Sequence, residues 1–511
     1  MPYINLFGFP VELSALKLVP RETAQKAESA PFIFSEKQVR LGTANPDNPG
    51  FKALRESLKK KGYGVKSYYI SKSSLRHILG FYENLIKQSA PAATSVVLEE
   101  EDLAKFQASV TSLKEIQARA SSATVTEMLD LLAAAALQLE ATDIHLEPGS
   151  KMLRVRYRLD GLLHDAAELP FATHKQLVGR IKLLAKLKLN ITQVAQDGRF
   201  TIQTKERPID VRVSVIPSQY GEAIVMRLLG VGALLLKVAD LGLRDQAADL
   251  IAQELKKPNG MILTTGPTGS GKTTTLYAFV NQFNSPQVKV ITLEDPIEYR
   301  IEGLEQTQVE EGKGYTFARG LRSILRQDPD VLLVGEIRDL ETAETAVSAA
   351  LTGHIVFSTL HTNDAAGALP RLIDMGVRPF VLAPAINAVI AQRLVRKVCK
   401  ECFSTYPLSP SDRQYIQSIL GPELSKRVAA DATLALPKGC KACNYLGYKG
   451  RTGIFEVFRI DDAMEKLILS AASVAEIREA AVAQGMLLMK QDGVLKALDH
   501  ITTIEEVERS V

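Results

Sequence analysis

Tryptophan, long apolar runs and a strong excess of one charge are all missing from this sequence of 511 residues. Lysine and arginine total 62 against 58 aspartate and glutamate, and a formal net charge of +4 does not favour a protein that coats a polyanion. No apolar run approaches the ~20 residues that a membrane helix needs, and the first residues lack the basic and apolar regions of a secretory signal. We therefore expect an intracellular protein with at most peripheral membrane contact.

Cysteine is also scarce, with only four residues in the whole chain. They form two C-x-x-C pairs separated by 37 residues. An intracellular protein of this size does not need a disulfide scaffold, whereas paired knuckles that use every cysteine are typical of a metal site. We predict one structural Zn²⁺ in a closed site of four thiolates, with four reduced core cysteines as the alternative. The predicted ligands are Cys399, Cys402, Cys440 and Cys443.

Hydrophobic residues make up 46 % and charged residues 23 % of the chain, the balance of an ordinary globular protein. At ~100–200 residues per domain, the length predicts about three to five domains. We expect a small mixed α/β domain at residues 1–87 and a linker at residues 88–120. The linker holds the small-residue run Ser89–Thr94 and the acidic run Glu99–Asp102.

Basic residues are concentrated in the first domain. Between Glu36 and Arg76, ten basic residues stand against three acidic ones. One interpretation is a solvated helix face, and the other is a docking face for an acidic partner.

The pattern of the chain changes twice after the linker. Residues 121–243 combine a helical pattern over Val125–Leu139 with alternating patterns over Met152–Leu163 and Ile209–Leu229, which predict strands. From residue 244 to residue 511, buried strands alternate with helices, as is typical of a parallel α/β sheet. We therefore expect an α+β domain followed by a larger α/β domain.

The most specific motif is a G-x4-G-K-[ST] sequence that follows the apolar strand Gly260–Thr265 and precedes a helical run. In this setting the loop cradles phosphates with its backbone amides, the lysine reaches the β- and γ-phosphates, and the threonine hydroxyl binds Mg²⁺. We predict a nucleotide triphosphate site with ATP and Mg²⁺ as ligands, the magnesium being held by Thr273. The site would be formed by Gly266, Thr268, Gly269, Ser270, Gly271, Lys272, Thr273 and Thr274.

Carboxylates and histidines follow or flank three of the expected strands. One apolar strand ends in Glu336, which could hold the water shell of Mg²⁺, and the cluster Glu294–Glu298 could orient or deprotonate an attacking water. Either cluster alone could also be a capped turn. His354 and His361 flank the strand Ile355–Ser358, and we interpret both as residues that sense phosphate.

Taken together, these segments resemble the secretion ATPase superfamily, which includes the GspE-type ATPases of type II secretion and the PilB-type assembly ATPases of type IV pili. The resemblance covers about residues 121–511. Besides the phosphate loop, it rests on an Asp box at Leu293–Tyr299, a Walker B segment at Leu325–Asp339 and a His box at Thr352–Thr362. It implies a RecA-like ATPase domain over residues 244–511, preceded by a PAS-like α+β domain.

The resemblance also implies roles and partners. Glu298 would act on the attacking water and Glu336 on the Mg²⁺ shell. The protein would be a homo-hexamer in the cytoplasm, at the inner face of the cytoplasmic membrane, bound to an inner-membrane platform protein through its N-terminal region. Retraction ATPases lack the four-cysteine segment at residues 399–443, so we expect a motor that drives pilin assembly or pseudopilus-based type II secretion. The shared motor chemistry leaves both pathways open.

A phosphate loop with one lysine leaves the charge that develops on the γ-phosphate incompletely neutralised, and ring ATPases commonly supply an arginine to the site. Within residues 121–243 we rank Arg199 and Arg212 as candidates and hold Arg227 lower. Surface ion pairing is the alternative for each of them.

Two other classes of protein remain as alternatives. A nucleic-acid translocase could combine a RecA-like motor with a zinc ribbon, but the weak net charge and the lack of tryptophan count against nucleic acid as a partner. A nucleotide-gated adaptor without turnover would not need the acidic and histidine residues that follow the strands. Hydrolysis stimulated by single-stranded DNA would indicate the first class, and absence of phosphate release the second.

Overall fold

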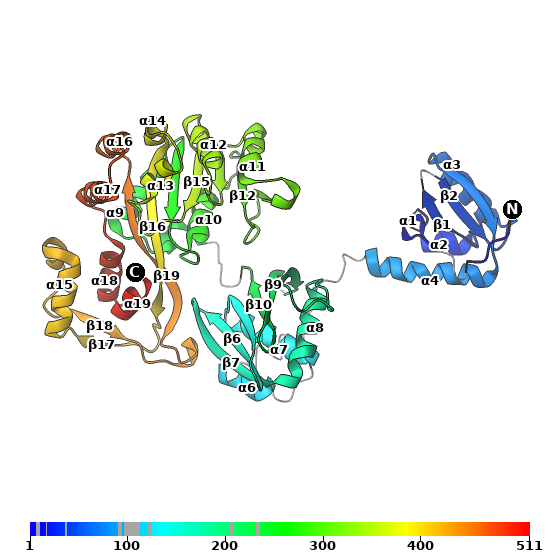
Figure 1. Cartoon of the computed structure of the whole chain (residues 1–511), viewed down its shortest axis with the longest axis horizontal. Coiled ribbons are helices and arrows are strands. Elements are labelled where there is room, and N and C mark those ends of the chain that lie inside the picture. Colours follow the sequence, from blue (N-terminus) through cyan, green and yellow to red (C-terminus); the bar gives the residue numbers. More distant parts are fainter. Residues whose placement is uncertain are drawn as a thin grey trace. The chain divides into compact units, whose positions relative to one another are not determined.

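The computed structural model describes residues 1–6, 11–16, 18–35, 38–89, 95–96, 113–120, 125–204, 208–230 and 236–511. The chain divides into two compact units, Met1–Val96 and Val97–Val511 (Figure 1). Most of the expected linker, including residues 90–94 and the acidic run at residues 99–102, lies outside the described residues. Within the part of the chain that is described, no helix has both the length and the apolar character needed to cross a bilayer.

The first unit is a small α/β fold around a three-stranded sheet in the order β1-β2-β3. β1 and β2 are antiparallel, and β2 and β3 are parallel. The bounds are α1 Leu13–Leu16, α2 Arg21–Lys26, β1 Ser29–Ser35, β2 Gln38–Thr43, α3 Pro49–Lys60, β3 Gly64–Tyr69, α4 Lys72–Ser89 and β4 Ser95–Val96.

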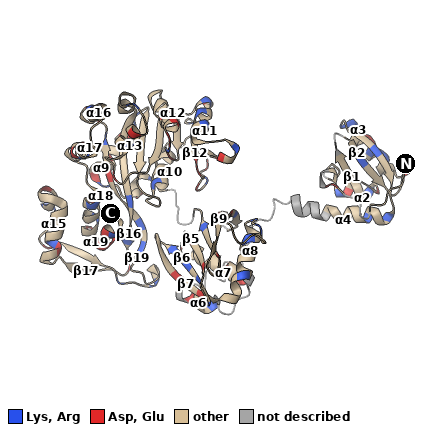
Figure 2. Ribbon diagram, viewed as in Figure 1, with Lys and Arg blue, Asp and Glu red and all other residues tan. Residues whose placement is uncertain are grey.

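Helix α3 contributes apolar side chains to the core of the first unit and carries part of the unit's basic charge. Asn48 caps the helix by accepting a hydrogen bond from the Gly50 amide at 2.8 Å, and proline occupies the first turn. Its apolar stripe is buried, and its lysines are exposed. Figure 2 shows the basic residues along this helix in blue. Arg40 and Lys66 also face each other across β2 and β3. Both interpretations of this basic surface stay open.

The second unit begins with an antiparallel sheet whose strands run in the order β8-β9-β10-β5-β6-β7. Alternate residues of β6 are buried, and the Tyr157 hydroxyl donates a hydrogen bond to the Leu132 carbonyl of α7 at 2.7 Å, which ties the sheet to that helix. The sequence-predicted α+β character is confirmed, and the PAS-like description stays a prediction. The bounds are α6 Leu113–Ala120, α7 Val125–Gln138, β5 Asp143–Pro148, β6 Met152–Leu159, β7 Leu162–Pro170, α8 His174–Leu184, β8 Gln196–Ile202, β9 Ile209–Ser218 and β10 Gly221–Leu228.

The larger part of this unit is a seven-stranded sheet in the order β13-β12-β14-β15-β11-β16-β19. All neighbours are parallel except β16 and β19, which confirms the predicted parallel α/β domain. Its strands are β11 Gly260–Thr265, β12 Val290–Glu294, β13 Glu305–Gln308, β14 Val331–Val334, β15 Ile355–Leu360, β16 Ile386–Val398 and β19 Tyr448–Arg459. Every residue of β11 is buried, as expected for a central parallel strand.

Helices cover this sheet, and a small insertion separates its last two strands. The insertion contains β17 Ser404–Pro407, α15 Pro410–Ser425 and β18 Thr433–Leu436, with β17 and β18 paired antiparallel. The helices are α9 Asp245–Glu254, α10 Lys272–Gln282, α11 Phe317–Ile324, α12 Leu340–Leu351, α13 Ala368–Asp374, α14 Pro379–Leu382, α16 Asp462–Leu469, α17 Val474–Ala483, α18 Met489–Leu498 and α19 Ile504–Ser510.

Candidate nucleotide site and metal centre

The phosphate loop connects β11 to α10 and is shaped by glycine. Gly266, Gly269 and Gly271 have φ angles of 143°, 80° and 89°, which residues with a side chain rarely adopt. A Cβ atom at Gly266 would also lie 2.7 Å from the Gln392 carbonyl oxygen. The N-terminus of α10 has no side-chain cap, so its amides are available for an anion.

Lys272 folds back onto its own loop. Its Nζ donates to the Gly266 and Pro267 carbonyls at 2.7 and 3.1 Å. Burial lowers the pKa of this amine from 10.5 to about 8. The hydroxyl of Ser270 is buried without a hydrogen-bond partner among the described residues. A charged amine held by carbonyls and an orphaned hydroxyl both fit a site that takes a phosphate.

Glu336 and His361 meet at the same edge of the sheet. Glu336 follows β14, His361 follows the neighbouring β15, and His361 Nε2 lies 3.1 Å from Glu336 Oε2. Arg338 forms an ion pair with Glu336. Burial acts to raise the pKa of the Glu336 carboxyl, but the hydrogen bonds with Arg338 and His361 outweigh burial and hold this pKa below its usual value. Glu336 is therefore an anion at neutral pH.

His354 does not join this group within one chain, and its role in sensing phosphate stays a prediction. His354 precedes β15, and its carbonyl accepts the amide of Gly260 at the start of β11. The phosphate loop leaves the other end of β11, about 20 Å away at ~3.3 Å per residue. The His354 ring bonds to the Ala349 carbonyl at 2.9 Å, a local structural contact. Residues that precede and follow one strand lie at opposite edges of the sheet.

The acidic cluster after β12 separates into two kinds of carboxylate. Glu294 is buried and accepts hydrogen bonds from Thr292 at 2.5 Å, from Gln306 at 3.2 Å and from the Tyr277 hydroxyl. Burial raises the pKa of Glu294, and its contacts are those of a structural residue. Glu298 is half-buried in the following loop, and Asp295, the third carboxylate of the cluster, is exposed and lies 3.8 Å from Arg338.

Gln306 fixes the shape of the loop that carries Glu298. Its Nε2 donates to the Tyr299 carbonyl at 3.1 Å, and its Oε1 accepts the Ile301 amide at 2.8 Å. No sequence motif indicates this contact, because Gln306 belongs to the short polar edge strand β13.

The candidate arginines form a row across the antiparallel sheet. Arg199 on β8 is opposite Arg212 on β9, which is opposite Arg227 on β10. Like charges on neighbouring strands repel one another, so this row is costly without an anion nearby. Arg227 binds Asp143 at 3.0 Å, whereas Arg199 is exposed.

Arg212 reaches the Asp box of its own chain. Its Nη2 donates to the Ile297 carbonyl at 3.0 Å. Burial lowers the pKa of Arg212, and the neighbouring Glu298 carboxylate acts in the opposite direction. Of the candidate arginines, Arg212 is therefore the one beside Glu298.

Strand β16 supports the phosphate loop in a way that the motifs did not reveal. Gln392 accepts a hydrogen bond from Thr275 of α10 at 2.8 Å and donates one to the Ser270 carbonyl at 2.7 Å. Its only sequence signal is a polar pair, Gln392 and Arg393, inside the apolar run Ala388–Val395. A polar side chain in a buried strand needs partners, and for Gln392 these are Ser270 of the phosphate loop and Thr275 of α10.

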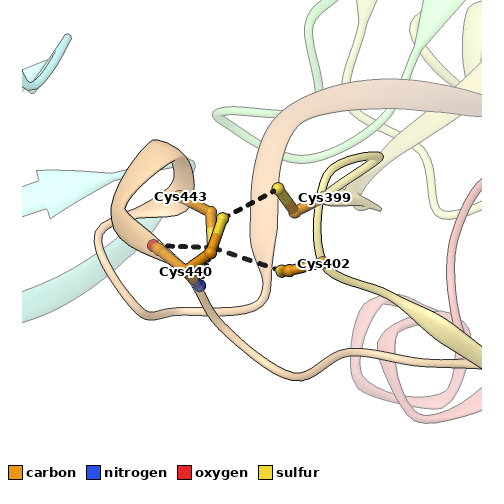
Figure 3. Close-up of side chains that lie close together, drawn as sticks. All are labelled: Cys399, Cys402, Cys440 and Cys443. Atoms are coloured by element: carbon orange, nitrogen blue, oxygen red, sulfur yellow. Dashed lines mark hydrogen bonds between the residues drawn. The ribbon is translucent and has the colours of Figure 1, made fainter.

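The four cysteines converge at the base of the insertion between β16 and β19 (Figure 3). All four sulfurs lie within 4.8 Å of one another. The separations are 3.9 Å for Cys399 and Cys440, 3.8 Å for Cys402 and Cys443, and 3.9 Å for Cys440 and Cys443. Tetrahedral Zn²⁺ with Zn–S distances of ~2.3 Å requires sulfurs about 3.8 Å apart, so the donor set fits this ion.

Comparisons with known proteins show which family and which fold this chain resembles. A family model described as "Type II/IV secretion system protein" matches residues 118–509. A type IV pilus assembly ATPase, PilB, of Myxococcus xanthus is 36 % identical over 99 % of this chain and 88 % of its own length. The type II secretion system protein E of Dickeya dadantii is 46 % identical over 76 % of each chain. The ATPase DotB of Legionella pneumophila shares the fold, with a TM-score of 0.55 and 21 % identity over 75 % of this chain and 94 % of its own.

Proposed function

The chain belongs to the family of type II/IV secretion system proteins, and from this membership we propose that it is a motor ATPase that drives pilin assembly or pseudopilus-based type II secretion. The observation that carries the proposal is the meeting of Lys272, Glu336 and His361 at one edge of the parallel sheet. Glu336 is close enough to Lys272 to act on the pKa of its amine. A phosphate-binding cation, an ionised carboxylate and a histidine are the groups that ATP hydrolysis needs.

Each group has a definite task in hydrolysis. Lys272 exchanges its loop carbonyls for the β- and γ-phosphates of ATP. Mg²⁺, when bound, neutralises phosphate charge, and Thr273 and Glu336 would hold it directly and through its water shell. Glu298 orients or deprotonates the attacking water. His361 senses the γ-phosphate and is linked to Glu336 by their 3.1 Å contact.

An arginine completes the neutralisation of charge in a homo-hexameric ring. Arg199 is exposed and free to reach a neighbouring subunit, whereas Arg212 lies beside the Asp box of its own chain. We assign Arg199 the role of a donor between subunits and Arg212 the role of a switch that leaves Ile297 when the domains close. Hydrolysis then changes the angle between the two domains and moves the platform protein.

The remaining parts of the chain serve anchoring and stability. The basic surface of residues 1–87 is suited to an acidic face of an inner-membrane platform protein, which would hold the motor peripherally at the inner face of the membrane. Zn²⁺ would bind the four cysteines and fix the insertion between β16 and β19. Lys397, Lys400, Lys438 and Lys441 lie beside the knuckles and offset the charge of four thiolates.

Phosphate release by the full chain tests the proposal. We expect Mg²⁺-dependent release from ATP that is lost in Lys272→Ala and is not raised by single-stranded DNA. Stimulation by DNA would favour a translocase, and the absence of release under all conditions would favour an adaptor without turnover. Either result would contradict the proposed function.

A further inference from the structure

Four consecutive residues that follow His361 are each held by a different element of the fold. The contacts are Thr362 with Thr265 of β11 at 2.8 Å, the Asn363 carbonyl with Arg393 of β16 at 2.9 Å, Asp364 with Arg478 of α17 at 2.5 Å, and the Ala365 amide with Glu456 of β19 at 3.0 Å. We call residues 361–367 the histidine loop. Two of its four anchors, Arg478 and Glu456, come from the C-terminal part of the chain, far in sequence from the phosphate loop.

Glu456 is the least expected of these anchors. Its side chain is 6 % exposed, and no salt bridge to it occurs among the described residues. One carboxylate oxygen accepts the Ala365 amide, and the other accepts the Met489 amide at the start of α18 at 3.2 Å. Burying a carboxylate is costly, and here two backbone amides from distant segments offset that cost.

We propose that Glu456, together with Arg478, is a positioning residue that holds His361 against Glu336 and joins the histidine loop to the start of α18. This inference rests on the proposed function, because it assumes that His361 faces the γ-phosphate. The loop cannot move without disturbing Glu456, and Glu456 also holds Met489. A shift at the nucleotide is thereby transmitted to the C-terminal helices.

Replacing Glu456 by glutamine tests its role, because the two side chains have nearly the same shape. A glutamine side chain has one acceptor oxygen and one NH₂ donor, so one of the two backbone amides would face a donor and lose its bond. We expect Glu456→Gln to lower kcat for ATP by about tenfold or more through misplacement of His361, and to change KM by less than about twofold. Arg478→Met should also lower kcat. Because the Arg478 side chain is partly exposed, this substitution should leave the protein folded.

Asp492 provides a matched control. It is a buried carboxylate on α18 that accepts the amide of Phe455, the neighbour of Glu456, and it pairs with Lys496 at 2.6 Å. It therefore ties α18 to the same stretch of β19 without touching the histidine loop. Asp492→Asn should lower thermal stability but leave kcat near the wild-type value.

Hydrogen exchange of the full chain without nucleotide adds a second readout. In Glu456→Gln, the Ala365 amide and the histidine loop should exchange faster than in the wild type, and in Asp492→Asn they should not. If wild-type protein shows no turnover, the proposed function fails while the exchange result still tests the anchor. If wild-type protein is active and folded Glu456→Gln and Arg478→Met keep its kcat and its exchange rates, the inference is overturned.

Discussion

Binding of ATP should take up a proton at alkaline pH, because burial disfavours the charge of the Lys272 amine and lowers its pKa. Its pKa of about 8, against 10.5 in an exposed lysine, means that burial, partly offset by Glu336, disfavours the charged form by about 3 kcal/mol net. A triphosphate beside the amine favours the charged form again and raises the pKa. At pH 9 about 0.9 of the amines are neutral before binding and become protonated in the complex, whereas at pH 7 only about 0.1 are.

Calorimetric titration with ATP in buffers of different ionisation enthalpy counts these protons directly. Between pH 8 and the pKa of the complex, affinity should fall by about tenfold per pH unit. Lys272→Arg is the matched control, because a guanidinium keeps its charge throughout this range and should bind without proton uptake. Equal uptake at pH 7 and pH 9, or uptake that persists in Lys272→Arg, would refute the reasoning.

Three further outcomes are expected. Glu298→Gln and Glu336→Gln should keep ATP binding while turnover falls by about 10²-fold or more, and normal turnover in Glu298→Gln would show that another group activates the water. Glu506 is paired with two arginines that, against the effect of burial, lower its pKa from 4.5 to about 2. Its contribution to stability is present above pH 4.5 and is lost as the pH falls toward 2, so Glu506→Gln should lower the free energy of unfolding by about 3 kcal/mol at pH 7 and by much less near pH 2. Metal analysis of protein purified without added zinc should find about one Zn²⁺ per chain, and Cys443→Ser should lose it; full folding and activity without metal would count against the site.

Much of the catalytic edge could be predicted from the sequence because local chemistry determines it. The G-x4-G-K-[ST] motif needs a buried strand before it, and β11 has the predicted bounds. The helix after the loop begins at Lys272, directly after Gly271, whose left-handed conformation turns the chain into the helix. The paired C-x-x-C spacing likewise predicted four sulfurs in one place.

The residues that support the site could not be predicted, because their roles depend on contacts between distant segments. Gln392 supports the phosphate loop from a strand more than 100 residues away, and Glu456 holds the histidine loop from the last strand of the sheet. His354 was grouped with His361 by sequence proximity, but strand direction separates them. The resemblance singled out Glu298 for chemistry, but the buried, hydrogen-bonded setting of Glu294 is visible only in the structure, where Glu298 is half-buried.

The dependence of specific activity on protein concentration tests the motor account most directly. Phosphate release per chain would be measured over a dilution series while sedimentation reports the size of the assembly. The account predicts Mg²⁺-dependent hydrolysis that rises steeply as rings form and that falls in Arg199→Ala without loss of nucleotide affinity. Full specific activity in a monomer at high dilution would contradict it.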